Sequence, residues 1–256
     1  MSRRSAARRR SGGRRPACAA KPASSPLRGG SPDPPRAARP ARGAASLHRA
    51  ARPVLVVGVT GASGAAYAVR LVECAVRTGR RVHLIVTAAG RLVMADETAA
   101  HFRGDALDLA SLWPHDVAAC VTYTPAEQLA APPASGSFDA QAAVIIPCSM
   151  NTLAALAHGL AGNLVQRAGQ VALKEGRPLV VVPREMPLTR IDLANMARLA
   201  DAGAAVMPAM PGFYHRPRSV ADLVDFVVAK ALDRLGIAHG LAVGWPGAGK
   251  NASRRA

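Results

Sequence analysis

The sequence predicts an α/β fold, namely a doubly wound, mostly parallel sheet with helices on both faces. Short, continuous apolar runs such as residues 54–59 and 142–148 have the length of strands that are buried on both faces. Stretches with helical spacing alternate with these runs, and this alternation is typical of parallel strands joined by helices. No apolar run reaches the roughly 18–20 residues that a membrane span needs, so we expect no membrane contact.

The regular elements are expected to begin after Pro53. VLVVGV (54–59) predicts a first strand, the small residues 60–64 a turn, and residues 65–78 a helix that Gly79 caps. The same patterns predict strands at 81–87, 142–148, 178–183 and 204–208, and helices at 88–100, 152–158, 164–175, 192–202 and 219–235, the last with Ser219 as its N-cap. Residues 103–140 are expected to be irregular, because Trp113-Pro114 and Pro132-Pro133 interrupt them.

Two tails are predicted to flank a single domain at residues 53–236. Residues 1–52 contain thirteen arginines and one lysine but a single acidic residue, so most of the net charge of +17 belongs to them. They have almost no large apolar residues, and we therefore expect a disordered tail; residues 237–256 are expected to form a second, flexible one. Three interpretations of the basic tail stay open: a transit peptide, a nucleic-acid-binding arm and a dispensable extension.

The cysteines give an expectation about the compartment. They stand apart from one another and form neither a CxxC pair nor a disulfide framework: Cys18, Cys74, Cys120 and Cys148. Reduced thiols predict a cytoplasmic location, or an organelle if residues 1–52 are a transit peptide.

Two turns of small and polar residues follow predicted strands. Ligands of parallel sheets bind at the carboxyl ends of the strands, so residues just after each strand are the candidates. Gly61, Ala62 and Ser63 open the first helix, where small residues and free N–H groups suit a phosphate. Residues 149–152 repeat the arrangement, although N-capping by Ser149 or Thr152 is an alternative. Together the two turns predict a site for a mononucleotide.

Charged and aromatic residues follow the last two strands. Arg184 and Glu185 end an apolar strand, where two charges indicate either a functional site or a structural ion pair. Tyr214 lies in a segment bounded by Gly and Pro that suggests a lid, and His215 beside it is a candidate acid or base unless it is simply exposed. No His, Cys and carboxylate spacing predicts a metal site, and no Gly-x-Ser-x-Gly motif predicts a serine nucleophile.

Read together, four segments resemble the flavin prenyltransferases of the UbiX type, which are Rossmann-like or flavodoxin-like proteins. They read GVTGASGAAYAVRL, IIPCSMNTLAALAHGLAGNL, QRAGQVALKEGRPLVVVPRE and MPAMPGFYHRP. The similarity runs from about Val54 to Leu235, and the last three segments, in this order and spacing, are far more specific than any glycine motif.

The resemblance implies a role for each matching residue. FMN would contact, by this likeness, Gly61, Ala62, Ser63, Thr87, Ser149, Met150, Asn151, Thr152 and Arg184. The phosphate of the donor, dimethylallyl monophosphate, would be held by Lys174, Arg184, Tyr214 and Lys230, with Arg167 from a neighbouring subunit. Glu97 and Glu185 match acidic residues near the reacting flavin edge, and the resemblance places Glu185, Glu97, Lys174 and Arg184 among the catalytic residues.

The resemblance also implies a metal-independent reaction. A dimethylallyl group would be joined to N5 and C6 of reduced FMN, and the basic residues would stabilise the departing phosphate. The prenylated FMN would pass to a UbiD-type decarboxylase. The family forms trimers or dodecamers with sites between subunits, and we expect neither a membrane nor a nucleic acid as partner.

Two departures from the family pattern keep alternatives open. Asn151 stands where many members carry Lys, and residues 189–192 replace a more usual His-Leu stretch. Asn151 also fits the flavin-dependent cysteine decarboxylases of the phosphopantothenoylcysteine type, although these have a Pro-x-Met-Asn clamp where residues 208–214 read PAMPGFY. A non-catalytic regulatory or RNA-binding module is the third interpretation.

Overall fold

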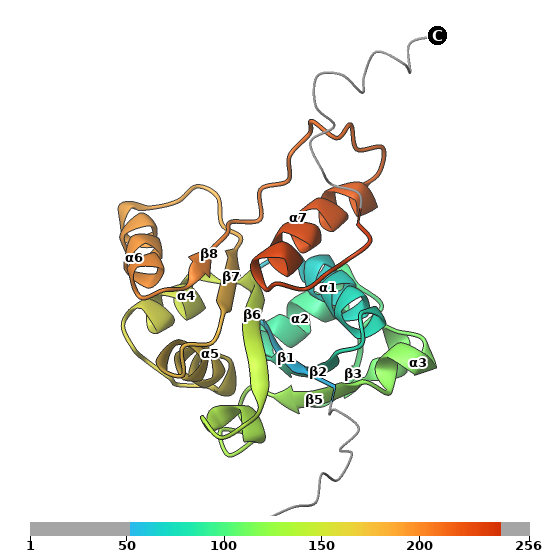
Figure 1. The fold of residues 1–256 in the computed structure, drawn as a ribbon, viewed down its shortest axis with the longest axis horizontal. Coiled ribbons are helices and arrows are strands. Elements are labelled where there is room, and N and C mark those ends of the chain that lie inside the picture. Colours follow the sequence, from blue (N-terminus) through green and yellow to red (C-terminus); the bar gives the residue numbers. More distant parts are fainter. Residues whose placement is uncertain (1–51, 242–256) are drawn as a thin grey trace, which may run out of the picture. The chain divides into compact units, whose positions relative to one another are not determined.

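A computed structural model of the chain describes residues 52–241, and their main feature is one six-stranded sheet (Figure 1). Its strands are β1 (Val54–Val59), β2 (Arg81–Val86), β5 (Val121–Pro125), β6 (Ala140–Cys148), β7 (Leu179–Pro183) and β8 (Ala205–Val206). They lie in the order β5-β2-β1-β6-β7-β8, and every neighbouring pair is parallel. The predicted fold class is confirmed.

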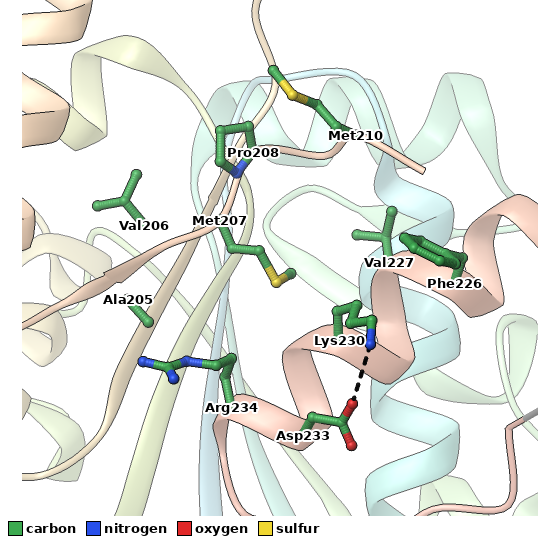
Figure 2. A pocket seen from close by; sticks show the side chains of 10 residues that line it. All are labelled: Ala205, Val206, Met207, Pro208, Met210, Phe226, Val227, Lys230, Asp233 and Arg234. Atoms are coloured by element: carbon green, nitrogen blue, oxygen red, sulfur yellow. Dashed lines mark ion pairs between the residues drawn. The ribbon is translucent and has the colours of Figure 1, made fainter. Parts of the chain in front are cut away.

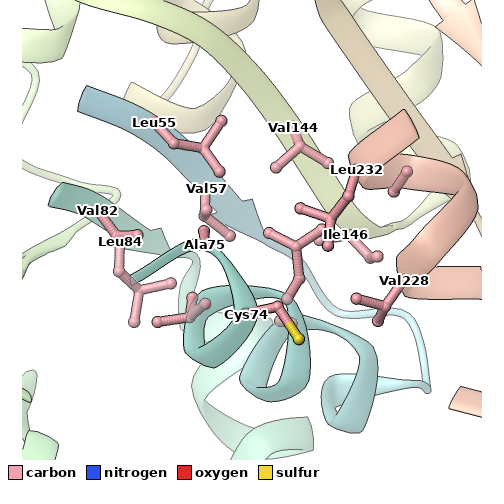
Figure 3. Packing of buried hydrophobic residues seen from close by; sticks show 14 of the residues in the cluster. Leu55, Val57, Cys74, Ala75, Val82, Leu84, Val144, Ile146, Val228 and Leu232 are labelled. Atoms are coloured by element: carbon pink, nitrogen blue, oxygen red, sulfur yellow. The ribbon is translucent and has the colours of Figure 1, made fainter. Parts of the chain in front are cut away.

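Helices cover both faces of this sheet, as expected. The helices on one face are α1 (Ala65–Arg77), α2 (Ala88–Glu97) and α7 (Val220–Arg234), and those on the other are α4 (Met150–Ala157), α5 (Leu164–Lys174) and α6 (Arg190–Asp201). Figure 3 shows Val57 and Ile146 of the sheet meeting Ala75 of α1 and Val228 of α7 in the first of two buried clusters. Because the strands are apolar on both faces, each face packs against its own helical layer.

The segment expected to be irregular contains regular elements. β5 extends the sheet beside β2, and β3 (His101–Arg103) pairs with β4 (Ala106–Asp108) in a separate antiparallel hairpin. The remaining elements there are the short helices η1 (Leu109–Ser111), α3 (His115–Ala118) and η2 (Pro132–Ala134). The prolines misled the prediction because they start elements instead of breaking them: Pro114 is the N-cap of α3, and Pro132 begins η2.

The chain packs against the core beyond the end of α7. Gly236 ends α7 with a left-handed φ of 65°, and the next residue, Ile237, turns back into the core, where 4% of it is exposed. Packing therefore continues past residue 236, and Leu241 also lies against the core. The rest of the two predicted tails, residues 1–51 and 242–256, lies outside the described residues.

Residues 189–192, which depart from the family pattern, start a helix. The Thr189 side chain accepts from the Asp192 backbone N–H, and the Asp192 carboxylate accepts from the Thr189 N–H, so the two form a capping box for α6. Across residues 52–241, none of the helices is both long enough and apolar enough to cross a membrane.

Candidate functional site

The carboxyl ends of β1, β6 and β7 meet at one edge of the sheet, and a buried threonine joins the first two. The Thr60 hydroxyl, in a residue that is only 1% exposed, donates to the Pro147 carbonyl over 2.9 Å. The same oxygen accepts from the Ser149 N–H at 2.7 Å, and the Arg184 N–H donates to the Cys148 carbonyl at 3.3 Å. The turns that follow the three strands are therefore held side by side.

The first turn packs closely on the start of α2. A Cβ atom added at Gly61 would lie 2.6 Å from the Cβ of Ala89, so only glycine fits here. Thr87 is the N-cap of α2: its hydroxyl accepts from the Gly90 N–H at 3.0 Å, and its own N–H donates to the Val59 carbonyl. Thr87 thus follows β2 and lies next to the end of β1.

The N-terminus of α1 is occupied by a carboxylate of the protein itself. One oxygen of Glu97, at the end of α2, accepts from the N–H groups of both Gly64 and Ala65 at 2.8 Å. The expectation that these N–H groups are free for a phosphate is therefore wrong. Ser63 remains exposed in the turn before them, and its side chain also hydrogen bonds to Glu97.

These contacts keep Glu97 ionised. Partial burial works to raise its pKa, but the hydrogen bonds from Ser63 and the two amides, with the nearby charge of Arg184, outweigh burial and lower that pKa. A carboxylate with a lowered pKa orients donors better than it delivers protons. In this chain Glu97 fixes the Ser63 hydroxyl and the start of α1.

The second turn serves partly as an ordinary helix cap. The Ser149 hydroxyl accepts from the Thr152 N–H, so Ser149 caps α4, and Thr152 is 2% exposed. Met150 is half-buried and Asn151 is exposed, which leaves the Asn151 amide as the polar side chain facing outward. Cys148 is fully buried, and burial raises the pKa of its thiol far above the ordinary value, which makes it a poor nucleophile.

Arg184 and Glu185 are both exposed, and their side chains are engaged separately. Arg184 Nε donates to the Ser63 carbonyl at 3.3 Å, which links the end of β7 to the first turn. Glu185 Oε1 accepts from the Met186 N–H at 3.1 Å. The structure thus brings Arg184 to the turns of residues 61–63 and 149–152, with the Glu185 carboxylate at the rim.

Tyr214 and Lys230 gather around Phe226 of α7. The Tyr214 ring lies edge-on to the Phe226 ring at 5.5 Å, and Lys230 Nζ lies 6.0 Å from the centre of that ring. Lys230 also lines a cavity of about 540 Å³ between α7 and the segment after β8, where Figure 2 shows its ion pair with Asp233. The Ala209 N–H donates to the Pro183 carbonyl, so this segment runs beside the end of β7 and hence beside Arg184.

Lys174 and Arg167 do not join the other phosphate-binding candidates within one chain. Both belong to α5, which covers the face of the sheet opposite α7. Lys174 ends that helix, roughly 16 Å from its start at the carboxyl edge, and its Nζ pairs with Glu175 at 2.6 Å. Arg167 Nε donates to the Ala134 carbonyl. A phosphate site that uses these two residues together with Arg184, Tyr214 and Lys230 needs more than one copy of the chain.

Thr60 and Phe226 are the site residues that sequence reasoning missed. A threonine directly after a buried strand was the available signal for Thr60, whereas Phe226 looks like any core residue of an apolar helix. Within residues 52–241, no group of three or more His, Cys, Asp and Glu side chains lies close enough together to hold a metal ion.

Known proteins are similar to this chain in sequence and in fold. The Flavoprotein family matches residues 44–232. The flavin prenyltransferase UbiX of Pseudomonas aeruginosa is 48% identical over 195 residues, 75% of this chain and 93% of that protein. The enzyme of the same name from Halalkalibacterium halodurans is 44% identical over 201 residues, 78% of this chain and 97% of that protein.

Two solved structures extend the comparison. The crystal structure of AnUbiX in complex with FMN and dimethylallyl pyrophosphate has a TM-score of 0.65 and 35% identity, covering 73% of this chain and 94% of that one. A dodecameric, FMN-dependent UbiX-like decarboxylase from Escherichia coli O157:H7 has a TM-score of 0.66 and 40% identity, covering 75% of this chain and 98% of that one.

Proposed function

This chain belongs to the flavin prenyltransferase family of flavoproteins, and on that premise we propose that it joins a dimethylallyl group to N5 and C6 of reduced FMN. The donor is a dimethylallyl phosphate: the sequence predicts the monophosphate, whereas the AnUbiX structure holds the pyrophosphate. We also propose that the product serves a UbiD-type decarboxylase, and that the protein acts in the cytoplasm, whose reducing conditions suit the free thiols of Cys74, Cys120 and Cys148.

The convergence of three strand ends is the observation that carries the proposal. Thr60 holds the turns after β1 and β6 together, and Arg184 bridges from β7 to Ser63. The close approach at Gly61 leaves backbone without side chain at the edge, which suits a flat ring system with a phosphate. We propose that residues 61–63, Thr87, residues 149–152 and Arg184 hold FMN.

The location of Glu97 refines this assignment. Because its carboxylate uses the N–H groups of Gly64 and Ala65, a flavin phosphate there would meet a negative charge. We therefore place the phosphate away from the start of α1. We propose that the Ser63 hydroxyl, which Glu97 orients, contacts the reactive part of the flavin ring. When bound, reduced FMN supplies the nucleophilic N5 and C6 positions.

The residues of this chain would then act on the donor. Negative charge builds up on the phosphate as its bond to the allylic carbon breaks, and cationic or hydroxyl groups around it lower the barrier. Arg184, directly after β7, Lys230 on α7 and Tyr214 in the segment that precedes α7 supply such groups. The exposed Glu185 carboxylate, at the rim, is suited to accept the proton that leaves the ring.

A second copy of the chain would complete the site. Lys174 and Arg167 lie on α5, on the opposite face of the sheet from Lys230, so we propose that they reach the donor phosphate of a neighbouring subunit. The dodecameric state of the Escherichia coli relative supports such an assembly.

The test is to incubate the purified protein with reduced FMN and either dimethylallyl monophosphate or pyrophosphate, and to weigh the flavin product. Prenyl transfer adds one dimethylallyl unit to the flavin. The runner-up, a cysteine decarboxylase, would leave the flavin mass unchanged and release carbon dioxide from a carboxyl-terminal cysteine. That second result would refute the proposed function.

A further inference from the structure

Three aromatic rings pack against one another where the segment before α7 meets that helix. The His215 ring stacks on Phe226 with centroids 5.2 Å apart and planes 12° from parallel. The Tyr214 ring lies edge-on to both, at 5.9 Å from His215 and 5.5 Å from Phe226. Phe226 is buried and fixed in the core, so it anchors the other two rings.

The backbone around these rings is shaped to let them meet. A Cβ atom at Gly212 would lie 2.9 Å from the Tyr214 ring and 3.0 Å from the Phe226 ring, so the chain passes directly over the cluster. Arg216, with φ of 56°, is the non-glycine residue with positive φ among residues 52–241. A backbone conformation of this kind persists only where surrounding contacts hold it.

The His215 ring contributes a flat surface to this cluster. Both of its nitrogens are buried, and neither has a hydrogen-bond partner among the described residues. Asp222 interacts with it electrostatically, and Lys230 Nζ lies 6.0 Å from the centre of the Phe226 ring on which His215 stacks. The contacts that hold His215 in place are therefore those of its ring.

We propose that His215 is a positioning residue whose stacking on Phe226 holds Tyr214 next to Lys230 for the prenyl donor. The inference rests on the proposed function for the identity of the donor. What matters is the ring's flat shape, so phenylalanine should replace it.

The experiment compares His215→Ala, His215→Phe and Phe213→Ala in the full-length protein. Phe213 is the matched control, because it is an exposed aromatic residue of the same segment and belongs to none of the three ring contacts. We expect His215→Ala to raise the KM for dimethylallyl monophosphate roughly three- to tenfold, the range that one aromatic contact supports. FMN affinity should stay unchanged, and His215→Phe and Phe213→Ala should resemble the wild type.

A second measurement does not depend on activity. Trypsin can cut after Arg218, whereas the Arg216–Pro217 bond resists it, so the rate of cleavage at residue 218 reports how firmly the segment is held. That rate should rise in His215→Ala and return to the wild-type value in His215→Phe, with folding checked by the melting temperature. If His215→Phe is as defective as His215→Ala in both assays, the ring nitrogens matter and the inference is wrong. If the wild type fails to prenylate FMN but the cleavage pattern holds, only the proposed function falls.

Discussion

At the scale of single residues, the site depends on side chains that hold the backbone more than on side chains that face outward. The Thr60 hydroxyl makes two buried hydrogen bonds between strand ends, and Glu97 makes two to the start of α1. Such bonds are worth most where a lost partner leaves a buried group unpaired. Small changes at these residues should therefore disturb flavin binding from a distance.

Ser63→Arg tests the first turn directly. Ser63 is exposed beside the close approach at Gly61, so an arginine side chain would fill the space proposed for the flavin. We expect FMN binding to be abolished while the melting temperature without FMN stays near that of the wild type. Flavin fluorescence titration measures the affinity, and an unchanged affinity would contradict the assignment of residues 61–63.

His83 should make stability depend on pH. It is buried in β2, its Nε2 lies 2.9 Å from the Thr124 hydroxyl, and burial lowers its pKa to about 4. The unfolded chain, with an ordinary histidine pKa of about 6.5, binds the proton more readily. This contribution to stability is therefore complete above about pH 6.5 and is lost as pH falls towards 4.

The measurement is the melting temperature between pH 4 and 7 in the wild type and in His83→Leu. The variant should show a smaller loss of stability across this window, because it has no proton to gain at this position. His101→Ala, a change at an exposed histidine of β3, is the control and should follow the wild type. Parallel curves for the wild type and His83→Leu would show that His83 does not titrate in this way.

At the scale of elements, the site is made by the relative placement of strand ends and helices. Thr60 sets the distance between the turns after β1 and β6, and α7 brings Lys230 beside the segment that carries Tyr214. A salt bridge from Arg70 of α1 to Asp225 of α7, at 2.7 Å, ties these two helices together. The flavin and donor regions are therefore positioned by separate contacts and should respond to separate mutations.

Thr60→Val should loosen the flavin region. Valine keeps the shape but removes the hydroxyl, and it leaves the Ser149 N–H and the Pro147 carbonyl without this partner. An unpaired buried group costs about 1–3 kcal/mol, so we expect a lower melting temperature and weaker FMN binding. Thr60→Ser, which keeps the hydroxyl, should recover most of both. Equal losses in the two variants would argue against the hydrogen bonds as the cause.

Lys230→Ala and Tyr214→Phe should weaken the donor region and spare the flavin region. A charge-assisted contact to phosphate contributes roughly 1.5–3 kcal/mol, so we expect kcat/KM for the donor to fall about tenfold or more. FMN affinity should remain that of the wild type, and Lys230→Arg should retain most of the activity. The hypothesis fails if kcat/KM is unchanged, or if both variants lose FMN to the same extent as the donor.

At the scale of the whole molecule, the residues that we propose for the donor phosphate lie on two faces of the sheet. Lys174 and Arg167 belong to α5, whereas Lys230 belongs to α7, on the other face. A single chain therefore cannot surround one phosphate with all of them. Assembly of copies is the arrangement that would join the two sets.

Mixed assemblies test this division. Lys174→Ala and Arg184→Ala should each be inactive alone, since each lacks one side of every shared site. Oligomers that contain both variants should recover part of the activity, because some interfaces then combine an intact Lys174 with an intact Arg184. The measurement is prenyl transfer after the two variants are expressed together. Absence of any recovery in verified mixed oligomers would show that Lys174 and Arg184 do not act together across a subunit interface.

The sequence by itself determined the parallel sheet and the residues that follow its strands. Continuous apolar runs can only be buried between two layers, and the carboxyl ends of parallel strands share one edge, so the turns at residues 61–63 and 149–152 were expected at that edge. That they lie side by side depends on the pairing of β1 with β6. The sequence prediction missed the short strand β5, because the prolines near it look like residues that break regular structure. In the structure these prolines start helices.

Only the tertiary structure decided which polar groups meet. Glu97, some thirty residues further along the chain, accepts hydrogen bonds from the N–H groups of Gly64 and Ala65. Its carboxylate lies where the sequence predicted a phosphate. Lys174 follows a helical pattern that looks the same on either face of the sheet, and its placement on the face opposite Lys230 depends on how α5 packs. Local patterns set what is buried, but the pairing of distant charges and donors is settled by packing alone.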